Sequence, residues 1–136
     1  MASVVPRVQI NSAGSAAVIG AGGSTSLAAN DLTLKVAGAV ADKTGLFFYG
    51  AGQASQPFGN GTLCLSSGGQ GIFRMPPAVT LAPDGSGTRA VDYASMTGAG
   101  QVSAGSTWYF QFWYRDPAGG GAGFNLSDGL QLTFCP

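Results

Sequence analysis

Aspartates are the only side chains of this sequence suited to acid–base catalysis, because it contains no histidine and its six acidic residues are all aspartates. Two carboxylates about 5 to 10 Å apart across a groove can hydrolyse a glycosidic bond. Asp92, Asp116 and Asp128 are the candidates for such a pair. Aspartates at turns and strand ends more often accept local hydrogen bonds. We therefore expect structural roles, and an Asp-dependent glycoside hydrolase is the less favoured hypothesis.

The lack of histidine also removes other kinds of site. Histidine is the usual general base, the partner of serine and cysteine nucleophiles, and the commonest zinc ligand. Calcium remains possible because it binds oxygen ligands, and Asn30-Asp31 or residues 125–128 could supply them from Gly-rich loops. Neither segment contains the spaced series of aspartates that is typical of a calcium-binding loop. We therefore predict no metal site, no cofactor and no catalytic residue.

An aromatic segment favours a different function, the stacking of rings on sugars. Residues 108–115 contain six aromatic residues, and the whole chain has 8 Phe, 4 Tyr and 2 Trp. In a strand they would alternate between two faces. The wholly apolar face, expected in the core, is Trp108, Phe110, Phe112 and Tyr114. The mixed face, expected to be partly exposed, is Tyr109, Gln111, Trp113 and Arg115.

The mixed face supplies the predicted ligand-binding residues, Tyr109, Trp113 and Arg115. If the chain binds a glycan, these side chains should contact it. Aromatic residues on a second face more often pack under a loop or against another subunit. We keep both roles open. The adjacent Arg115 and Asp116 are expected to fix the end of the strand.

Cys64 and Cys135 form a candidate disulfide, because an even cysteine count is compatible with one bridge. The bridge would close a loop of 135 − 64 = 71 residues, worth roughly 4 kcal/mol in the chain-entropy model. Two unrelated buried thiols are the alternative. A bridge would indicate an oxidising, extracellular setting.

The elements that must position these residues are expected to be β-strands. Residues 32–36 and 130–134 alternate between apolar and polar, whereas residues 45–49 are apolar on both faces, as in a central strand. The chain has no Glu and two Lys, so good helix formers are scarce. The expected strands are 16–19, 32–36, 45–49, 63–65, 72–75, 88–93, 108–115 and 130–134.

These strands predict an all-β fold, an antiparallel two-sheet β-sandwich or jelly roll of about eight strands, with a closed barrel as the second choice. Residues 1–14 are expected to be a lead-in or a first edge strand, and residues 15–136 a single module. Residues 51–61 are predicted to form a polar loop. The Gly-rich residues 119–123 are predicted to form a flexible hairpin loop. Pro76-Pro77 should end the strand at residues 72–75.

Charge excludes some partners. Only 9% of the residues are charged and the formal net charge is +0, so no basic face is available for nucleic acid. No apolar run approaches the roughly 20 residues of a membrane-spanning helix, so we predict no membrane insertion. The first residues do not look like a secretory leader. Few charges guard the sheet edges, so self-association into an oligomer or filament is plausible.

Four segments resemble a module found near the C-terminal ends of large secreted proteins of planctomycetes and myxobacteria. The most specific is Trp108-Tyr109-Phe110-Gln111-Phe112-Trp113-Tyr114-Arg115-Asp116. The others are Asn30-Asp31-Leu32-Thr33-Leu34, Gly61-Thr62-Leu63-Cys64-Leu65 and Asn125-Leu126-Ser127-Asp128-Gly129-Leu130. The resemblance covers roughly residues 14–134. It implies a secreted or cell-surface location and a longer parent chain, but no activity. In such modules the partner of the Leu-Cys-Leu cysteine usually lies upstream or centrally, unlike Cys135.

Taken together, these features predict a non-catalytic extracellular module for adhesion, surface display or self-assembly of a secreted bacterial protein. A carbohydrate-binding module, with an extracellular glycan as partner, is the alternative. Low charge, the absence of histidine and the family resemblance favour the first hypothesis.

Overall fold

The computed structural model describes residues 2–3 and 10–136, and it confirms the predicted all-β fold. Strands make up 46% of it and short helical turns 7%, and the strands form antiparallel sheets in a β-sandwich arrangement. The described strands, in chain order, are β1 (Ala2–Ser3), β2 (Val18–Gly22), β3 (Thr33–Ala37), β4 (Thr44–Gly50), β5 (Gly52–Phe58), β6 (Gly61–Ser66), β7 (Ile72–Arg74), β8 (Val79–Thr80), β9 (Gly87–Ala90), β10 (Thr107–Arg115), β11 (Phe124–Leu126) and β12 (Leu130–Thr133).

The central layer is a sheet in the order β1-β12-β10-β4-β7, and β11 and β8 add to β10 and β4 respectively. Strand β10 lies in its middle, as its length and aromatic content predicted. On one side β10 pairs with β4, and on the other with β12 and β11 in turn. β1 is the two-residue edge strand of this sheet. The rest of the predicted lead-in, residues 1 and 4–9, lies outside the described residues.

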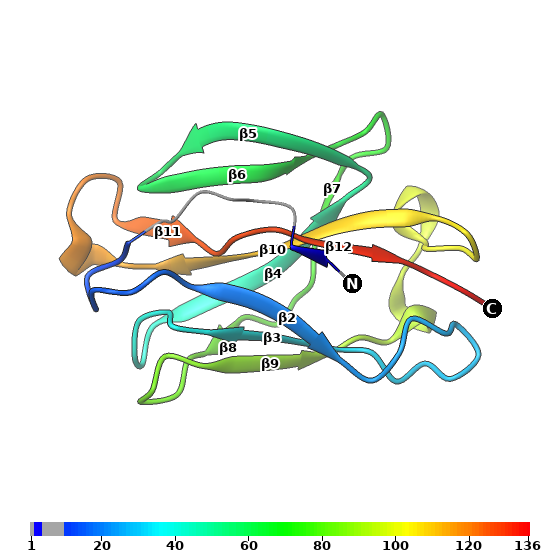
Figure 1. The fold of residues 1–136 in the computed structure, drawn as a ribbon, viewed down its shortest axis with the longest axis horizontal. Coiled ribbons are helices and arrows are strands. Elements are labelled where there is room, and N and C mark those ends of the chain that lie inside the picture. Colours follow the sequence, from blue (N-terminus) through cyan, green and yellow to red (C-terminus); the bar gives the residue numbers. More distant parts are fainter. Residues whose placement is uncertain (1, 4–9) are drawn as a thin grey trace.

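One face of the central sheet packs on a second sheet, β2-β3-β9, which lies below it in Figure 1. The alternation of β10 decides this face: Trp108, Phe110, Phe112 and Tyr114 are all buried there. Alternating residues of β3 complete the core from the opposite sheet, where Leu34 and Val36 are buried and Lys35 is exposed. These two sheets are the predicted sandwich.

The hairpin β5–β6 covers the other face of the central sheet, above it in Figure 1, and forms a third layer. It encloses a second apolar cluster of Phe48, Leu65 and Leu126. The prediction that residues 51–61 form a polar loop is wrong, because Gly52–Phe58 is a seven-residue strand. Its side chains are mostly exposed, so it lacks the apolar alternation of a half-buried strand.

Short segments complete the fold. Three 3-10 turns are η1 (Tyr93–Ser95), η2 (Gly98–Gly100) and η3 (Pro117–Gly119). The loop that contains η3 joins β10 to its neighbour β11, so the Gly-rich residues do form a hairpin connection. Strand β7 ends just before Pro76-Pro77, as predicted. Within the described residues, no helix has the length and apolar character needed to span a bilayer.

Candidate functional site

The second face of β10 carries the predicted ligand-binding residues under the hairpin β5–β6. Tyr109 and Trp113 are half-buried and pack against the second apolar cluster, whereas Arg115, at the end of the strand, is exposed. Gln111, between the two rings, is completely buried. The predicted alternation of β10 is therefore observed, but its second face is a packed surface and not an open one.

Gln111 anchors the hairpin to the sheet. Its Nε2 donates to the carbonyls of Thr62 at 2.8 Å and Ser127 at 2.6 Å, and its Oε1 accepts from the backbone N–H of Cys64 at 2.9 Å. The side-chain amide therefore hydrogen-bonds backbone groups of β6 on the edge that does not pair with β5, as a neighbouring strand would. The same Nε2 lies 3.1 Å from the Cys64 sulfur. The Gln111 side chain therefore ties β6 to the central sheet.

Asn60 holds the turn of the hairpin against the loop between β10 and β11. Its Nδ2 donates to the Gly120 carbonyl and its Oδ1 accepts from the Ala122 N–H, both at 2.9 Å. Its own N–H donates to the Phe124 carbonyl at 3.0 Å. Gly59 lies flat against the ring of Phe124, where a Cβ would come within 2.2 Å of a ring carbon. The hairpin is therefore tethered both at its turn and along β6.

A groove of about 620 Å³ lies between the hairpin and the central sheet. One wall is a series of rings: Phe58 and Phe124 have centroids 5.2 Å apart, and Phe124 and Trp113 have centroids 5.6 Å apart. Six strands contribute to it, β5 and β6 of the hairpin and β4, β7, β10 and β11 of the central sheet. Its lining residues are Leu46, Phe48, Phe58, Leu63, Ile72, Arg74, Trp113 and Phe124. Such a volume, lined mostly by apolar side chains with few polar groups, is typical of a small-ligand site.

The groove includes only one of the three predicted ligand-binding residues. Trp113 lines it, but Tyr109 and Arg115 do not. Sequence reasoning missed Arg74, Phe58 and Phe124, which come from strands distant in sequence. Phe58 and Ile72 are apolar residues with 44% and 46% of their surface exposed, which can be recognised only in the folded structure. No local pattern signals them, because the groove exists only where the hairpin meets the sheet.

No family model, curated protein or solved structure matches this chain. The groove and the polar groups around it are therefore the features that bear on function.

The three candidate catalytic aspartates have structural partners. Asp116 is buried, and its carboxylate accepts from the N–H of Ser12 at 2.9 Å and from the Ser12 hydroxyl. Asp128 accepts from the N–H of Ile19 at 2.8 Å, which links the β11–β12 connection to β2.

Asp92 caps the turn η1 and accepts from Ala94 N–H at 3.0 Å and Asn30 Nδ2 at 3.1 Å. These hydrogen bonds hold the pKa of Asp92 below its usual value. It therefore behaves as a capping residue at neutral pH.

The candidate calcium ligands are also engaged in local hydrogen bonds. Asp31 accepts from the N–H of Ser24 at 3.1 Å and from its hydroxyl at 2.6 Å. Asn125 is buried, and its Oδ1 accepts from the Leu126 N–H at 2.8 Å. Among residues 2–3 and 10–136 there is no group of three or more acidic or cysteine side chains placed to hold a metal ion.

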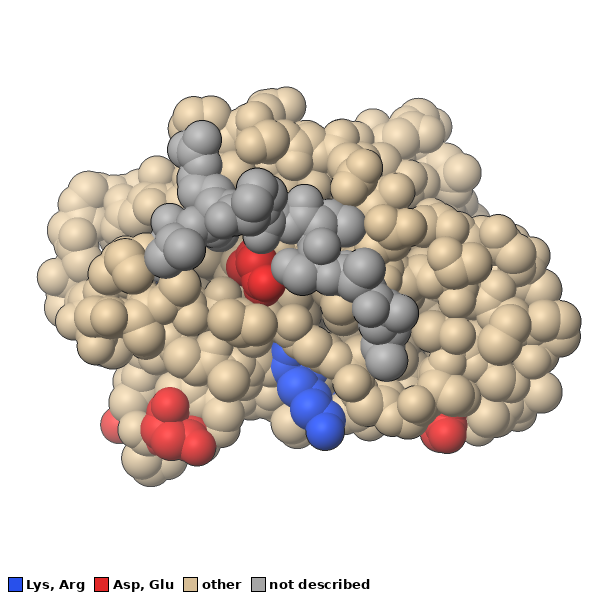
Figure 2. Space-filling model, in the orientation of Figure 1, with Lys and Arg blue, Asp and Glu red and all other residues tan. Residues whose placement is uncertain are grey.

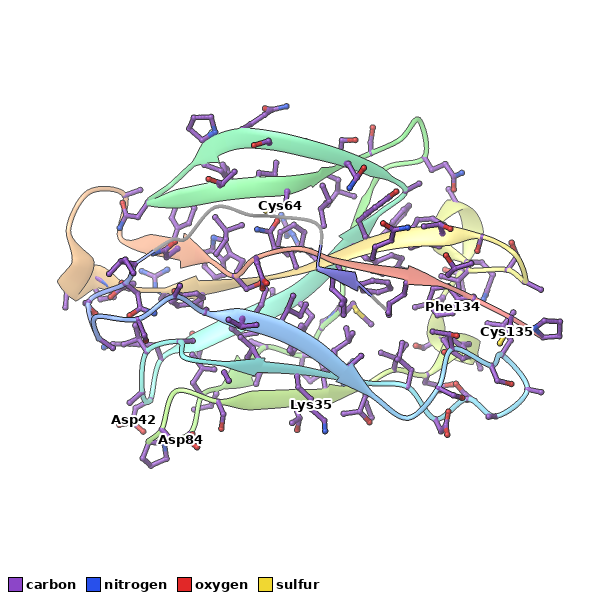
Figure 3. The ribbon with its side chains drawn as sticks, in the orientation of Figure 1. Lys35, Asp42, Cys64, Asp84, Phe134 and Cys135 are labelled. Carbon is purple, nitrogen blue, oxygen red and sulfur yellow. The ribbon has the colours of Figure 1, made fainter. Side chains whose placement is uncertain are left out.

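The predicted disulfide between Cys64 and Cys135 is not formed, and both cysteines are free. Cys64 is buried beneath the hairpin, whereas Cys135 follows β12, is exposed, and forms a bridge pair with Ser26 of the β2–β3 connection. Figure 3 shows the two side chains well separated. The cause is their placement in the fold, because Cys64 lies on β6 in the hairpin layer, whereas Cys135 lies beyond the end of β12, next to Ser26 of the β2–β3 connection.

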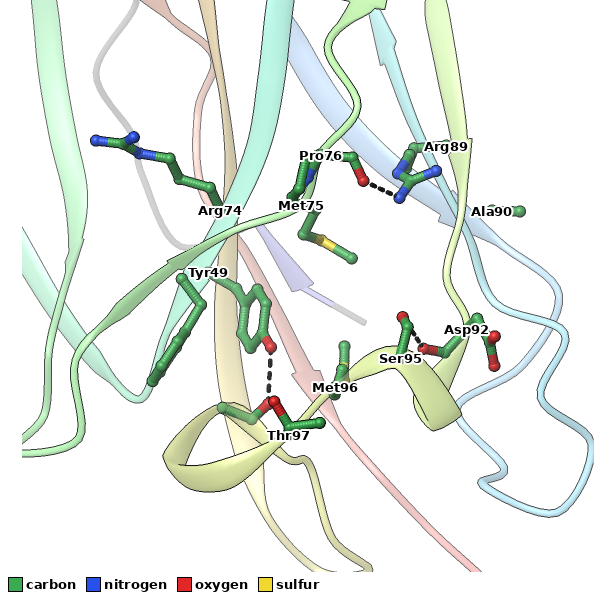
Figure 4. Close-up of a pocket in the computed structure, with 12 residues that line it drawn as sticks. Tyr49, Arg74, Met75, Pro76, Arg89, Ala90, Asp92, Ser95, Met96 and Thr97 are labelled. Atoms are coloured by element: carbon green, nitrogen blue, oxygen red, sulfur yellow. Dashed lines mark hydrogen bonds between the residues drawn. The ribbon is translucent and has the colours of Figure 1, made fainter.

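A second hollow of about 440 Å³ opens at the side of the sandwich, between β7 and β9. Many of its polar groups already have partners (Figure 4): Arg89 donates to the Pro76 carbonyl, the Tyr49 hydroxyl donates to the Gly100 carbonyl at 2.7 Å, and the Ser95 hydroxyl donates to the Asp92 carbonyl at 2.7 Å. Because these hydrogen bonds join parts of the protein to one another at the side of the sandwich, we interpret this hollow as a feature of the fold and not as a ligand site.

Proposed function

We propose that this chain is a non-catalytic binding module of a secreted or cell-surface protein, which acts in adhesion or surface display through the groove beside the β5–β6 hairpin. The observation that carries the proposal is the combination of a preformed apolar groove with a hairpin tethered by Gln111 and Asn60. A groove with rigid walls loses little conformational entropy when it binds a ligand.

The surroundings of the aspartates support a non-catalytic role. Asp116 and Asp128 accept hydrogen bonds from backbone N–H groups, and Asp92 caps a turn. None of the three lines the groove. A hydrolase would need two carboxylates facing a common substrate position.

A carbohydrate remains the second candidate ligand, because Trp113 is half-buried on the groove wall. An indole face open to a groove is suited to stacking on a sugar ring. The low charge also suits an adhesive surface: the face drawn in Figure 2 has only a few separated charged groups.

Self-assembly through sheet edges is the weaker form of the proposal. The open strand β5 has a register irregularity between Gln53 and Gln56 and contains Pro57, and both features oppose pairing with another chain. Edge strand β2 uses its Ile19 N–H to bond Asp128. These features take the place of the charged residues that usually prevent an edge strand from pairing with another chain.

Trp113 provides a direct test of the groove. In the variant Trp108→Phe, Trp113 is the only tryptophan, so its emission reports on the groove. Cello-, xylo-, manno- and chito-oligosaccharides and short-chain carboxylates and alcohols would be titrated against it. We expect at least one of them to change the emission in a saturable way, with no release of reducing sugar.

Ile72→Glu and Val18→Glu form the matched pair for this test. Both positions are exposed apolar residues, at 46% and 54%, but only Ile72 lines the groove. The charge at position 72 should abolish the change in emission, and the charge at position 18 should not. Equal effects of the two substitutions, or no response to any compound, would contradict the proposal.

A further inference from the structure

The polarity of the groove restricts the chemistry of its ligand. Seven of its eight lining residues are apolar, and Arg74 is the one with a polar side chain. No acidic residue lines it. The ligand that fits should therefore be mainly apolar, with one group that an arginine recognises.

Arg74 is placed to receive an anion. It pairs with Phe48 across β4 and β7, so its side chain starts on the same face of the sheet as the groove. Arg74 also lines the second hollow, but in Figure 4 its guanidinium points away from the other labelled residues of that hollow. It is exposed, and no other described residue forms a hydrogen bond or ion pair with it. Its charge is therefore available to a carboxylate, which an arginine can bind with two parallel hydrogen bonds.

Two other kinds of ligand fit less well. An oligosaccharide would place hydroxyl groups against seven apolar side chains, and each hydroxyl without a partner costs about 1–3 kcal/mol. A peptide that adds a strand would need a long open edge beside the groove. Two edge strands line the groove: β7 has three residues and is followed closely by Pro76-Pro77, whose nitrogens cannot donate, and β5 contains Pro57 and a register irregularity.

We propose that the groove binds a linear amphipathic carboxylate, a free acyl chain of medium length. The hydrocarbon chain lies along the wall formed by Phe58, Phe124 and Trp113, and the carboxylate reaches Arg74. This assignment rests on the proposed function, since it names the ligand class of the same groove.

The test uses the Trp108→Phe protein and four probes at concentrations below micelle formation: hexanoate, octanoate, decanoate and 1-octanol. Affinity should rise about two- to fourfold per added methylene, as burial of a hydrocarbon chain implies. Octanoate should bind about tenfold more tightly than 1-octanol, because only octanoate carries the charge. Equilibrium dialysis of radiolabelled decanoate gives the same dissociation constant independently of Trp113.

Arg74→Gln and Arg115→Gln are the matched variants. Both arginines are exposed on strands of the central sheet, but only Arg74 lines the groove. Arg74→Gln should weaken octanoate about tenfold, to the level of 1-octanol, and leave 1-octanol unchanged. Arg115→Gln should leave both constants unchanged. Arg74→Lys keeps the charge but loses the bidentate geometry, so its affinity for octanoate should lie between that of the protein with Arg74 and that of Arg74→Gln.

The outcomes separate this inference from the proposed function. If octanoate and 1-octanol bind equally, or if the two arginine variants behave alike, the carboxylate assignment is wrong but the groove is still a binding site. If only an oligosaccharide changes the Trp113 emission, the ligand is a sugar. If no probe responds in either assay, both proposals fail.

Discussion

Cys64 and Cys135 differ sharply in environment, and this difference governs their chemistry. Burial, reinforced by the negative charge of Asp128, raises the pKa of the Cys64 thiol to about 12, although the hydrogen bond from Gln111 opposes the shift. Cys135 is exposed. Because the thiolate is the reactive form, only one of the two thiols should react readily in the folded protein.

We predict that a thiol reagent at pH 8 modifies Cys135 and leaves Cys64 intact until the chain unfolds. Mass spectrometry of the labelled peptides measures this directly. Rapid modification of both cysteines would show that the hairpin does not protect Cys64. Modification of neither would indicate the bridge that the structure lacks.

The same pKa has a consequence for stability. The fold favours the neutral thiol of Cys64, so this contribution is complete below the ordinary pKa of 9.0 and is lost as pH rises towards about 12. Cys64→Ala removes the group. The free energy of unfolding of this variant should therefore fall less steeply above pH 9 than that of the natural chain. The variant also serves as the control for the labelling experiment.

At the level of single residues, the sequence predicted what alternation controls. The two faces of β10 follow from the period of a strand, and so does the burial of Phe110 and Phe112. The cysteine pairing could not be predicted, because it depends on which side of a sheet each strand lies. Gln111 was assigned to a partly exposed face, yet it is completely buried, since its partners come from residues 62, 64 and 127.

Among the elements, the hairpin β5–β6 depends most on one side chain. Gln111→Leu keeps the volume of the side chain but leaves the Thr62 and Ser127 carbonyls and the Cys64 N–H without this partner. We expect a loss of about 3 kcal/mol in the free energy of unfolding, measured by urea denaturation. The substitution should also speed up modification of Cys64.

Gln56→Leu is the control for this prediction. Gln56 lies on the exposed strand β5, so its replacement should change the free energy of unfolding by less than about 0.5 kcal/mol. If Gln111→Leu behaves like Gln56→Leu, the hairpin is held mainly by its apolar contacts with Leu126 and Phe48 and not by the amide.

Most strands could be located from the sequence, and β5 is the longest of those that were missed. β3, β4, β10 and β12 are half-buried or fully buried, so their patterns are clear. β5 is mostly exposed and pairs only with β6, so its residues Gly52–Phe58 are polar or small and resemble a loop. The groove could not be predicted, because it needs the third layer that β5 and β6 create.

For the whole molecule, we predict a monomer of 13.6 kDa in solution. The edges of the described sheets are short or interrupted: β1 has two residues, β7 has three, and β5 contains a proline and a register irregularity. Light scattering over a wide concentration range measures the mass. A mass that grows with concentration, or filaments in negative-stain images, would instead favour the self-assembly hypothesis.

The isolated position of Cys135 makes the molecule easy to orient on a surface. Cys135 is exposed beyond the end of β12, beside Thr25 of the β2–β3 connection, and it does not line the groove at the β5–β6 hairpin. A maleimide-coated sensor chip should therefore capture the natural chain in a single orientation, with the groove left free. No engineered tag would be needed, and every captured copy would present the same face to a ligand.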